Sequence, residues 1–115
     1  MKIEEHKING EAIAEIISDE VIIKTPQEGI DLMGDMYFQG FDKIILQEKH
    51  LASEFFDLKT GMAGEILQKF STYRMRLAIV GDFGKYSSKS LQDFIRESNN
   101  GKLVNFVATT ARALI

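Results

Sequence analysis

The feature that most constrains the fold of this chain is a pair of short apolar segments with a helical pattern between them. The first segment covers residues 43–46, and the second, more strongly apolar, covers 76–81. Two buried strands joined through a helix indicate a parallel strand pair, because such a connection returns the chain to the same end of the sheet. The apolar residues between the segments recur at the spacing of one helix face, and they are Met62, Ile66, Leu67, Phe70 and Tyr73.

A hairpin and a helix are expected before this unit. Asn9-Gly10 is the strongest short signal for a two-residue turn, because both central residues of a type I′ turn need positive φ. It joins expected strands at 2–8 and 11–17. The segment Thr25–Glu28 has the pattern of a capping box with proline at the first helical position, and Gly40 is the stop signal of the helix that follows. The residues expected on the inner face of that helix are Ile30, Leu32, Met33, Met36 and Tyr37.

The last third of the chain repeats the alternation of helix and strand. Ser87 or Ser88 is expected to cap a third helix, which is followed by a strand at 103–107 and a short final helix. The order of elements is therefore β-β-α-β-α-β-α-β-α. It predicts a single α/β domain over residues 1–115, with a mixed sheet flanked by helices and parallel after the antiparallel hairpin.

Composition excludes several classes of protein. The chain contains no cysteine, which excludes disulfides, thiol catalysis and cysteine-ligated metal centres. Its formal charge is −3, whereas nucleic-acid-binding domains usually carry a basic excess. No apolar run approaches the roughly 20 residues that span a bilayer, and the first residues lack the pattern of a secretory signal. We therefore expect a cytoplasmic protein with neither a nucleic-acid partner nor a membrane partner.

The candidate ligand-binding residues follow the two central strands. In open α/β sheets, ligands usually bind beyond the carboxyl ends of the strands. Glu48 and His50 follow the first strand, and Asp82, Lys85 and Ser87 follow the second. The second segment combines glycines with a helix start, which favours anion binding, but it lacks the spacing of a phosphate-binding loop. The alternative is a structural turn, in which the glycines allow the backbone geometry and the serines cap the helix.

Two further features have a structural and a functional interpretation. His50 is interpreted as a solvated surface histidine, because one histidine beside one carboxylate does not make a metal site. The aromatic segment 37–41 is expected in the core, and a self-association surface is the alternative. No constellation of residues for catalysis, metal binding or cofactor binding is recognised, so no cofactor is expected.

Four longer stretches of the sequence resemble a known bacterial family. They are residues 55–61, 64–70, 77–83 and 89–99. In these stretches the chain is similar to the domain-of-unknown-function family 4180, and the likeness extends over nearly the whole chain. The resemblance implies a stand-alone bacterial domain and brings no assigned activity with it.

A more distant resemblance is to the anti-sigma-factor antagonist (STAS) fold, which has the same order of strands and helices. In that fold a loop presents an Asp-Ser-Ser/Thr-Gly motif at a helix start, and a partner kinase phosphorylates its hydroxyl. The nearest match here is Asp57–Met62, in which two residues separate Asp57 from Thr60. The resemblance implies Thr60 as the phosphorylation site. The alternative is that Thr60 caps the helix that begins near Gly61.

Together these features predict a non-enzymatic regulatory module of STAS-like architecture that binds a protein partner or a second copy of itself. Its contact surface is expected around residues 57–64 and 81–88. The alternative is a small-molecule or anion-binding domain, enzymatic or not, with its site at the carboxyl ends of the central strands. That alternative requires four residues to converge on one pocket, namely Glu48, His50, Asp82 and Lys85.

Overall fold

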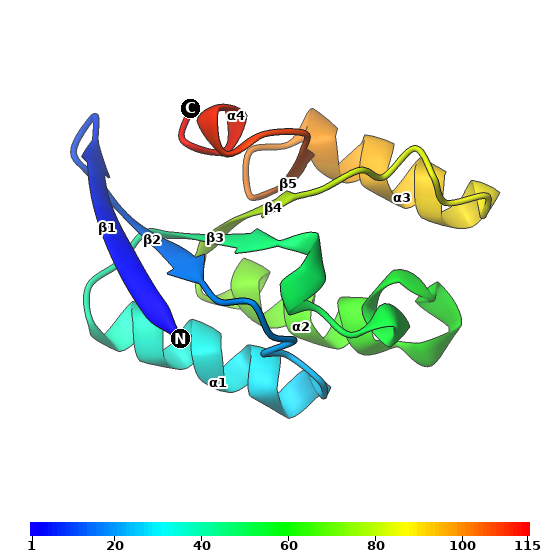
Figure 1. Cartoon of the computed structure of the whole chain (residues 1–115), viewed down its shortest axis with the longest axis horizontal. Helices are drawn as coiled ribbons and strands as arrows, with labels where there is room; N and C mark the ends of the chain where they lie inside the picture. Colours follow the sequence, from blue (N-terminus) through cyan, green and yellow to red (C-terminus); the bar gives the residue numbers. More distant parts are fainter.

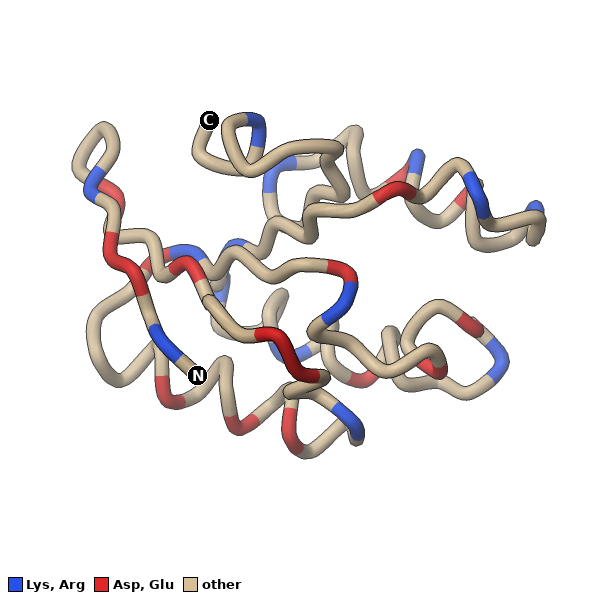
Figure 2. Tube along the Cα trace, viewed as in Figure 1, with Lys and Arg blue, Asp and Glu red and all other residues tan.

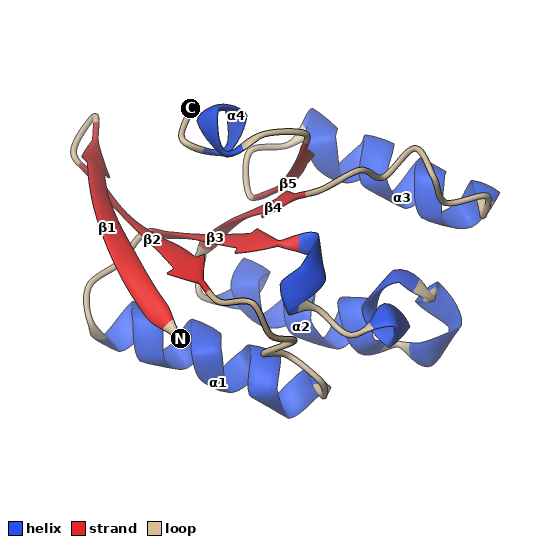
Figure 3. Cartoon of the chain, viewed as in Figure 1, coloured by secondary structure: helices blue, strands red, loops and turns tan.

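The computed structural model describes residues 1–115, which form a five-stranded sheet with helices packed on it (Figure 1, Figure 3). The strands are β1 (Lys2–Ile8), β2 (Glu11–Ile17), β3 (Lys43–Gln47), β4 (Arg76–Val80) and β5 (Val104–Val107). The helices are α1 (Pro26–Phe38), α2 (Met62–Thr72), α3 (Lys89–Asn100) and α4 (Thr110–Ala113), and three short 3-10 turns lie between β3 and α2. The predicted order of strands and helices is confirmed.

The hairpin and the first helix begin where the local sequence signals place them. Asn9 and Gly10 have φ angles of 52° and 80°, the positive values of a type I′ turn, and β1 and β2 pair antiparallel across them. The Thr25 hydroxyl accepts from the Glu28 amide at 3.2 Å, and the Glu28 carboxylate accepts from the Thr25 amide at 3.2 Å. These reciprocal hydrogen bonds confirm the predicted capping box.

The strand order explains why three helices lie on one face of the sheet. The strands follow the sequence order β1-β2-β3-β4-β5, and every pair after the hairpin is parallel. When the order never reverses, each right-handed crossover places its helix on the same side. α1 and α2 therefore run side by side under the sheet (Figure 1), and α3 packs against β5. Without a reversal, the sheet also lacks the crevice in which ligands of open α/β sheets usually bind.

The main core lies between the sheet and these three helices. Alternate strand residues such as Ile44, Leu77 and Phe106 are buried in it, and they share it with Met33 of α1 and Phe70 of α2. Since neighbouring strands are in register, these residues stand in rows across one face. We call this side the helix face.

The opposite side of the sheet, which we call the open face, is covered only in part. It carries the alternate residues of the same strands, among them Lys43, Ile45, Arg76 and Ala78. A small apolar cluster on this face includes Ala113 of α4, which packs on the strand residues. That helix has only four residues, and Figure 1 shows it on the side opposite α1 and α2. The open face is therefore the part of the sheet with the least helical cover.

The free edge of β5 is closed by a side chain. The Asn99 amide group of α3 accepts from the Phe106 N–H at 2.7 Å and donates to the Phe106 carbonyl at 3.1 Å. It thus pairs with the backbone as a neighbouring strand would. Unpaired edge groups are a template for association with other strands, and Asn99 occupies two of them.

Several aromatic residues expected in the core lie on the surface. Tyr37 is 50% exposed, Tyr73 is 47% exposed and Phe38 is 93% exposed. Tyr37 and Tyr73 stand at the ends of α1 and α2, and their rings pack edge to face with centroids 5.4 Å apart. The expectation that residues 37–41 enter the core is therefore wrong for Tyr37 and Phe38, whereas Phe41 packs against the core.

Candidate functional site

The carboxyl ends of β3 and β4 meet at Glu48, the first residue after β3. The turn after β4, residues 81–88, folds over its side chain. Glu48 accepts hydrogen bonds from the Tyr86 hydroxyl, from Lys85 Nζ at 2.9 Å and from the Asp82 amide at 3.3 Å. Three donors of one turn therefore hold this carboxylate in place.

These contacts shift the pKa values of Glu48 and Tyr86 in opposite directions. Burial acts to raise the Glu48 pKa, but the hydrogen bonds from Tyr86 and Lys85 outweigh it and leave the pKa below its usual value. Burial and the hydrogen bond to Glu48 raise the Tyr86 pKa. The carboxylate, the phenol and the ammonium group thus satisfy one another, and neither Glu48 nor Tyr86 is poised to exchange a proton near pH 7.

Gly81 lies where no side chain fits. A Cβ at this position would lie 2.6 Å from Glu48 Oε1, 2.7 Å from Glu48 Cβ and 3.0 Å from the Phe83 ring. The Tyr86 ring stacks on Phe56 with centroids 5.2 Å apart. We call Glu48, Gly81, Lys85 and Tyr86 the Glu48 clamp, because together they pin the turn after β4 to the end of β3.

The four residues of the predicted anion pocket do not converge. Glu48 and Lys85 pair with each other in the clamp. Asp82 is exposed and lines a separate groove of about 730 Å³ over the ends of β4 and β5. His50 points toward the segment that follows β2. The carboxyl ends of the strands therefore offer no pocket that combines the four side chains.

His50 is a buried structural residue. It is 1% exposed, so the expectation of a solvated histidine is wrong. Its Nδ1 accepts from the Gln47 amide at 2.9 Å, which leaves the proton on Nε2, and Nε2 donates to the Ser18 carbonyl at 2.9 Å. Burial lowers the His50 pKa, the bond to Ser18 acts in the opposite sense, and Lys49 adds to the lowering. Neutral His50 therefore ties the end of β3 to the chain after β2.

Asp57 and Thr60 shape the turn before α2. Asp57 is exposed and caps the 3-10 turn that follows it. The Thr60 hydroxyl donates toward the carbonyls of Glu54 and Asp57, at 2.7 Å and 2.8 Å, and accepts from the Met62 amide at 3.2 Å. The last bond satisfies the first amide of α2, which supports the capping interpretation. Phosphorylation of Thr60 stays a prediction. A phosphoryl group would take the place of the proton that this hydroxyl donates to the Glu54 and Asp57 carbonyls.

The start of α3 distinguishes the two candidate serines. The Ser88 hydroxyl accepts from the Leu91 amide at 3.2 Å and is the cap. Ser87 precedes it and is exposed. The role of Ser87 in binding a ligand or partner therefore stays a prediction.

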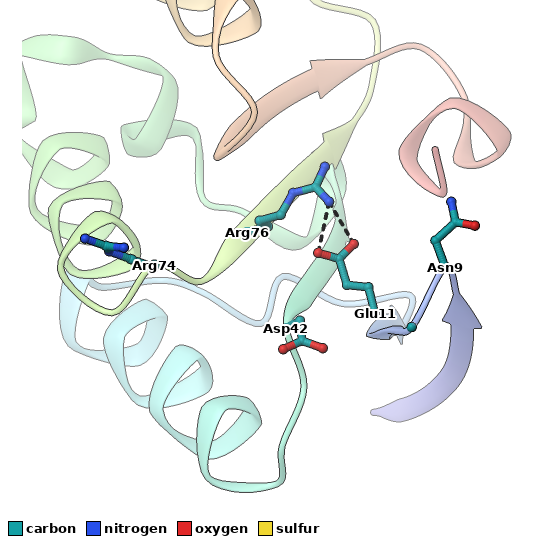
Figure 4. A pocket seen from close by; sticks show the side chains of 6 residues that line it. Asn9, Glu11, Asp42, Arg74 and Arg76 are labelled. Carbon is teal, nitrogen blue, oxygen red and sulfur yellow. Dashed lines mark hydrogen bonds and ion pairs between the residues drawn. The ribbon is translucent and has the colours of Figure 1, made fainter.

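The amino ends of the strands hold a second group of charged residues (Figure 4). Arg76 of β4 donates two hydrogen bonds to the Glu11 carboxylate of β2, at 2.7 Å and 2.9 Å. Asp42 accepts from the Ala12 amide at 2.9 Å. Arg74 has a φ of 53°, and its side chain points away from Arg76 in Figure 4. The hollow between these residues has a volume of about 360 Å³, and none of the residues that line it is hydrophobic.

Sequence reasoning missed two residues that matter for surface chemistry. Lys43 is 3% exposed, and its ammonium group donates to the Ala113 carbonyl of α4. A lysine at the first position of a strand gives no signal that a segment 70 residues later will bury it. Phe38 did carry a signal, because it follows Gly34 by one helical turn and so stands away from the inner row of Met33 and Met36.

The acidic residues of the chain do not form a metal-binding cluster. Figure 2 shows acidic positions in red along the hairpin and α1, yet no three His, Asp or Glu side chains lie close enough together to hold a metal ion. None of the helices combines the length and the apolar character that crossing a membrane requires.

Comparison with known proteins identifies the family. Comparison with curated proteins and with solved structures finds no match, so the resemblance to the STAS fold stays a prediction. The family model described as "Domain of unknown function (DUF4180)" matches residues 8–115. Because this match covers nearly the whole chain and agrees with the resemblance in the sequence, the chain belongs to the DUF4180 family.

Proposed function

We propose that this domain is a non-enzymatic protein-interaction module that binds a second copy of itself through the outer side of α1 and α2. We call this side the α1–α2 surface. The observation that carries the proposal is the 93% exposure of Phe38 beside the half-exposed rings of Tyr37 and Tyr73. Exposed apolar patches with a polar rim mark interaction sites, and aromatic residues dominate the binding energy of protein interfaces.

Gly34 gives this surface a hole at its centre. It stands one helical turn from both Ile30 and Phe38, and a Cβ at Gly34 would meet nothing within 4 Å. Glycine inside a helix costs about 0.5–1 kcal/mol relative to alanine, and no close contact within the chain explains its presence here. The hole opens into a groove of about 600 Å³ between α1 and α2. An aromatic side chain from outside fits such an opening.

Charge favours a second copy as the occupant. Asp31 and Asp35 line one wall of the groove and Lys69 lines the other, and the six ion pairs of the chain include none of them. A two-fold axis brings the same surface of both copies together. Such an arrangement sets the carboxylates of one copy against the partner subunit's Lys69 and sets Phe38 over the partner subunit's Gly34.

The proposal also accounts for the lack of catalytic geometry. The polar groups at the carboxyl ends of β3 and β4 are bound to one another in the Glu48 clamp. An enzyme needs titratable groups that are free to meet a substrate. The α1–α2 surface instead offers what association needs, which is uncovered apolar area beside unpaired charge.

Light scattering with size-exclusion chromatography tests the proposal. The wild-type chain should have the mass of a dimer at high protein concentration. Phe38→Ser should lower the association constant about tenfold or more, because it removes the anchoring ring. Val21→Ser is the matched control, since Val21 is also exposed, at 40%, but lies outside α1 and α2 and does not line the groove between them. A monomeric wild type, or a dimer that Phe38→Ser leaves unchanged, would contradict the proposal.

A further inference from the structure

A groove on the open face combines three cationic side chains with an apolar wall. It lies between α4 and the strands β4 and β5, and its volume is about 700 Å³. Lys43, Arg76 and Arg112 line it together with Asn105. This groove is remote from the α1–α2 surface, because α4 covers the opposite face of the sheet (Figure 1).

Arg76 is held in a fixed position at one end of this groove. Its Nη1 donates twice to Glu11, at 2.7 Å and 2.9 Å, and its Nε donates to the Lys102 carbonyl at 2.9 Å. The second terminal nitrogen, Nη2, has no partner among these hydrogen bonds. Figure 4 shows the guanidinium group above Glu11, with the Glu11 carboxylate on one side only. The Arg76 guanidinium group is therefore held in one orientation and keeps N–H donors free for a further anion.

The other two cations lack a carboxylate partner. Lys43 donates to the Ala113 carbonyl but forms no ion pair, and Arg112 is exposed and forms none either. Glu11 is the one carboxylate side chain that pairs with any of the three. Positive charge is thus in excess on this part of the open face.

The apolar wall defines the rest of the ligand. Val107, Ala108 and Ile115 line the same groove as the cations, and each of them has exposed surface. A bare inorganic ion would leave these side chains in contact with water. A ligand with both an anionic head and a small apolar body would cover them, and burial of apolar area stabilises binding by about 25 cal/mol per Å².

We infer that this groove binds a small organic anion, whose carboxylate or phosphate group contacts Arg76 and Arg112 above the buried ammonium group of Lys43 and whose apolar body lies on Val107 and Ala108. The lowered pKa of Lys43 agrees with this inference. Burial lowers the Lys43 pKa, the Arg76 charge lowers it further, and Glu11 acts in the opposite sense. A bound anion would offset both lowering effects, because it supplies the counter-charge that the protonated amine lacks.

Nuclear magnetic resonance titration with four probes tests the inference. The probes are benzoate, phenyl phosphate, inorganic phosphate and the neutral benzyl alcohol. Saturable shifts of the Arg76, Val107 and Ala113 amides are expected with benzoate or phenyl phosphate, and the preferred head group identifies the ligand class. Binding of benzyl alcohol as tight as that of benzoate would exclude the role of charge. Binding of inorganic phosphate as tight as that of phenyl phosphate would exclude the role of the apolar wall.

Variants separate a built site from general charge attraction. Arg112→Gln should weaken benzoate binding about tenfold, the effect of one lost charge-assisted hydrogen bond, without loss of fold, since Arg112 is exposed. Arg96→Gln on α3 is the matched control, because it removes the same charge from an exposed site outside the groove. Equal weakening in both variants, or the absence of saturable binding in the wild type, would overturn the inference.

Discussion

At the Glu48 clamp the polar groups bind one another, whereas the α1–α2 surface leaves large apolar side chains uncovered. The Glu48 side chain is 15% exposed and accepts from three donors, while Gly81 leaves no space beside it. Phe38 is 93% exposed, and nothing of the chain lies within 4 Å of a Cβ at Gly34. A region whose polar groups are hydrogen-bonded within the chain gains little free energy from binding a ligand. A region with uncovered apolar area gains free energy when a partner covers it.

The largest effect should come from filling the clamp. Gly81→Ala should lower the free energy of unfolding by about 3 kcal/mol, because its Cβ would overlap Glu48 at both Cβ and Oε1. Gly84→Ala in the same turn is the control. Its nearest neighbour would be Asp82 Oδ1 at 3.8 Å, so its effect should stay within about 0.5 kcal/mol. Urea unfolding measures both, and equal effects would show that the clamp is not tightly packed.

Removal of the clamp's charge should have a somewhat smaller effect that depends on pH. Glu48→Gln should cost about 2 kcal/mol near neutral pH, since hydrogen bonds to a charged group are lost. The folded pKa of Glu48 lies below the ordinary 4.5. Its stabilising contribution is therefore complete above that value and is lost as the pH falls through the folded pKa. Urea unfolding should show the difference in unfolding free energy between the two proteins narrow as the pH falls below 4.5; a difference that stays constant with pH would contradict this role of the Glu48 charge.

A second pH effect should come from His50 at the end of β3. Because burial lowers its pKa below 6.5, the unfolded chain takes up a proton there before the folded chain does. Stability should therefore fall as the pH drops below 6.5 toward the folded pKa. Thermal unfolding between pH 7.5 and pH 5.5 should show this slope in the wild type but not in His50→Gln. The same slope in both proteins would show that groups other than His50 cause it.

The smallest change in stability should come from the α1–α2 surface, and it should have the opposite sign. Gly34→Ala should raise the free energy of unfolding of the monomer by about 0.5–1 kcal/mol, because its Cβ enters open space. It should also weaken self-association, since the methyl group narrows the hole. Gly64→Ala in α2 is the control, for its Cβ also meets nothing. It should give a similar gain in stability and leave association unchanged. Weaker association in both variants would therefore contradict the role of Gly34.

Local signals allowed most of the fold to be predicted. The Asn9-Gly10 turn and the Thr25–Glu28 capping box act through neighbouring residues, so their effect can be read from a few positions. The strand pattern at 43–46 and 76–81 likewise gave β3 and β4. In each case the residues that decide the structure lie close together in the sequence.

The side-chain arrangement could not be predicted, because it depends on partners far apart in the chain. The Glu48 carboxylate accepts from Tyr86, which lies in a turn 38 residues later, and it pairs with Lys85 of the same turn, whose ammonium group offsets the charge that made Glu48 a candidate site. His50 is buried against the Ser18 carbonyl, 32 residues earlier. Lys43 is covered by α4 at the end of the chain. Pattern and spacing describe an element's own faces and do not say what will cover them.

Self-association through the α1–α2 surface is tested by an isotope-filtered nuclear Overhauser experiment on an equal mixture of labelled and unlabelled chains. This experiment detects only contacts between copies, so the neighbourhood of Phe38 and Gly34 within one helix does not contribute. Cross-peaks are expected between the Phe38 ring protons of one copy and the Gly34 α-protons of the other. A dimer whose intermolecular cross-peaks arise elsewhere, for example from the open face, or a sample without any such peaks, would contradict the proposal.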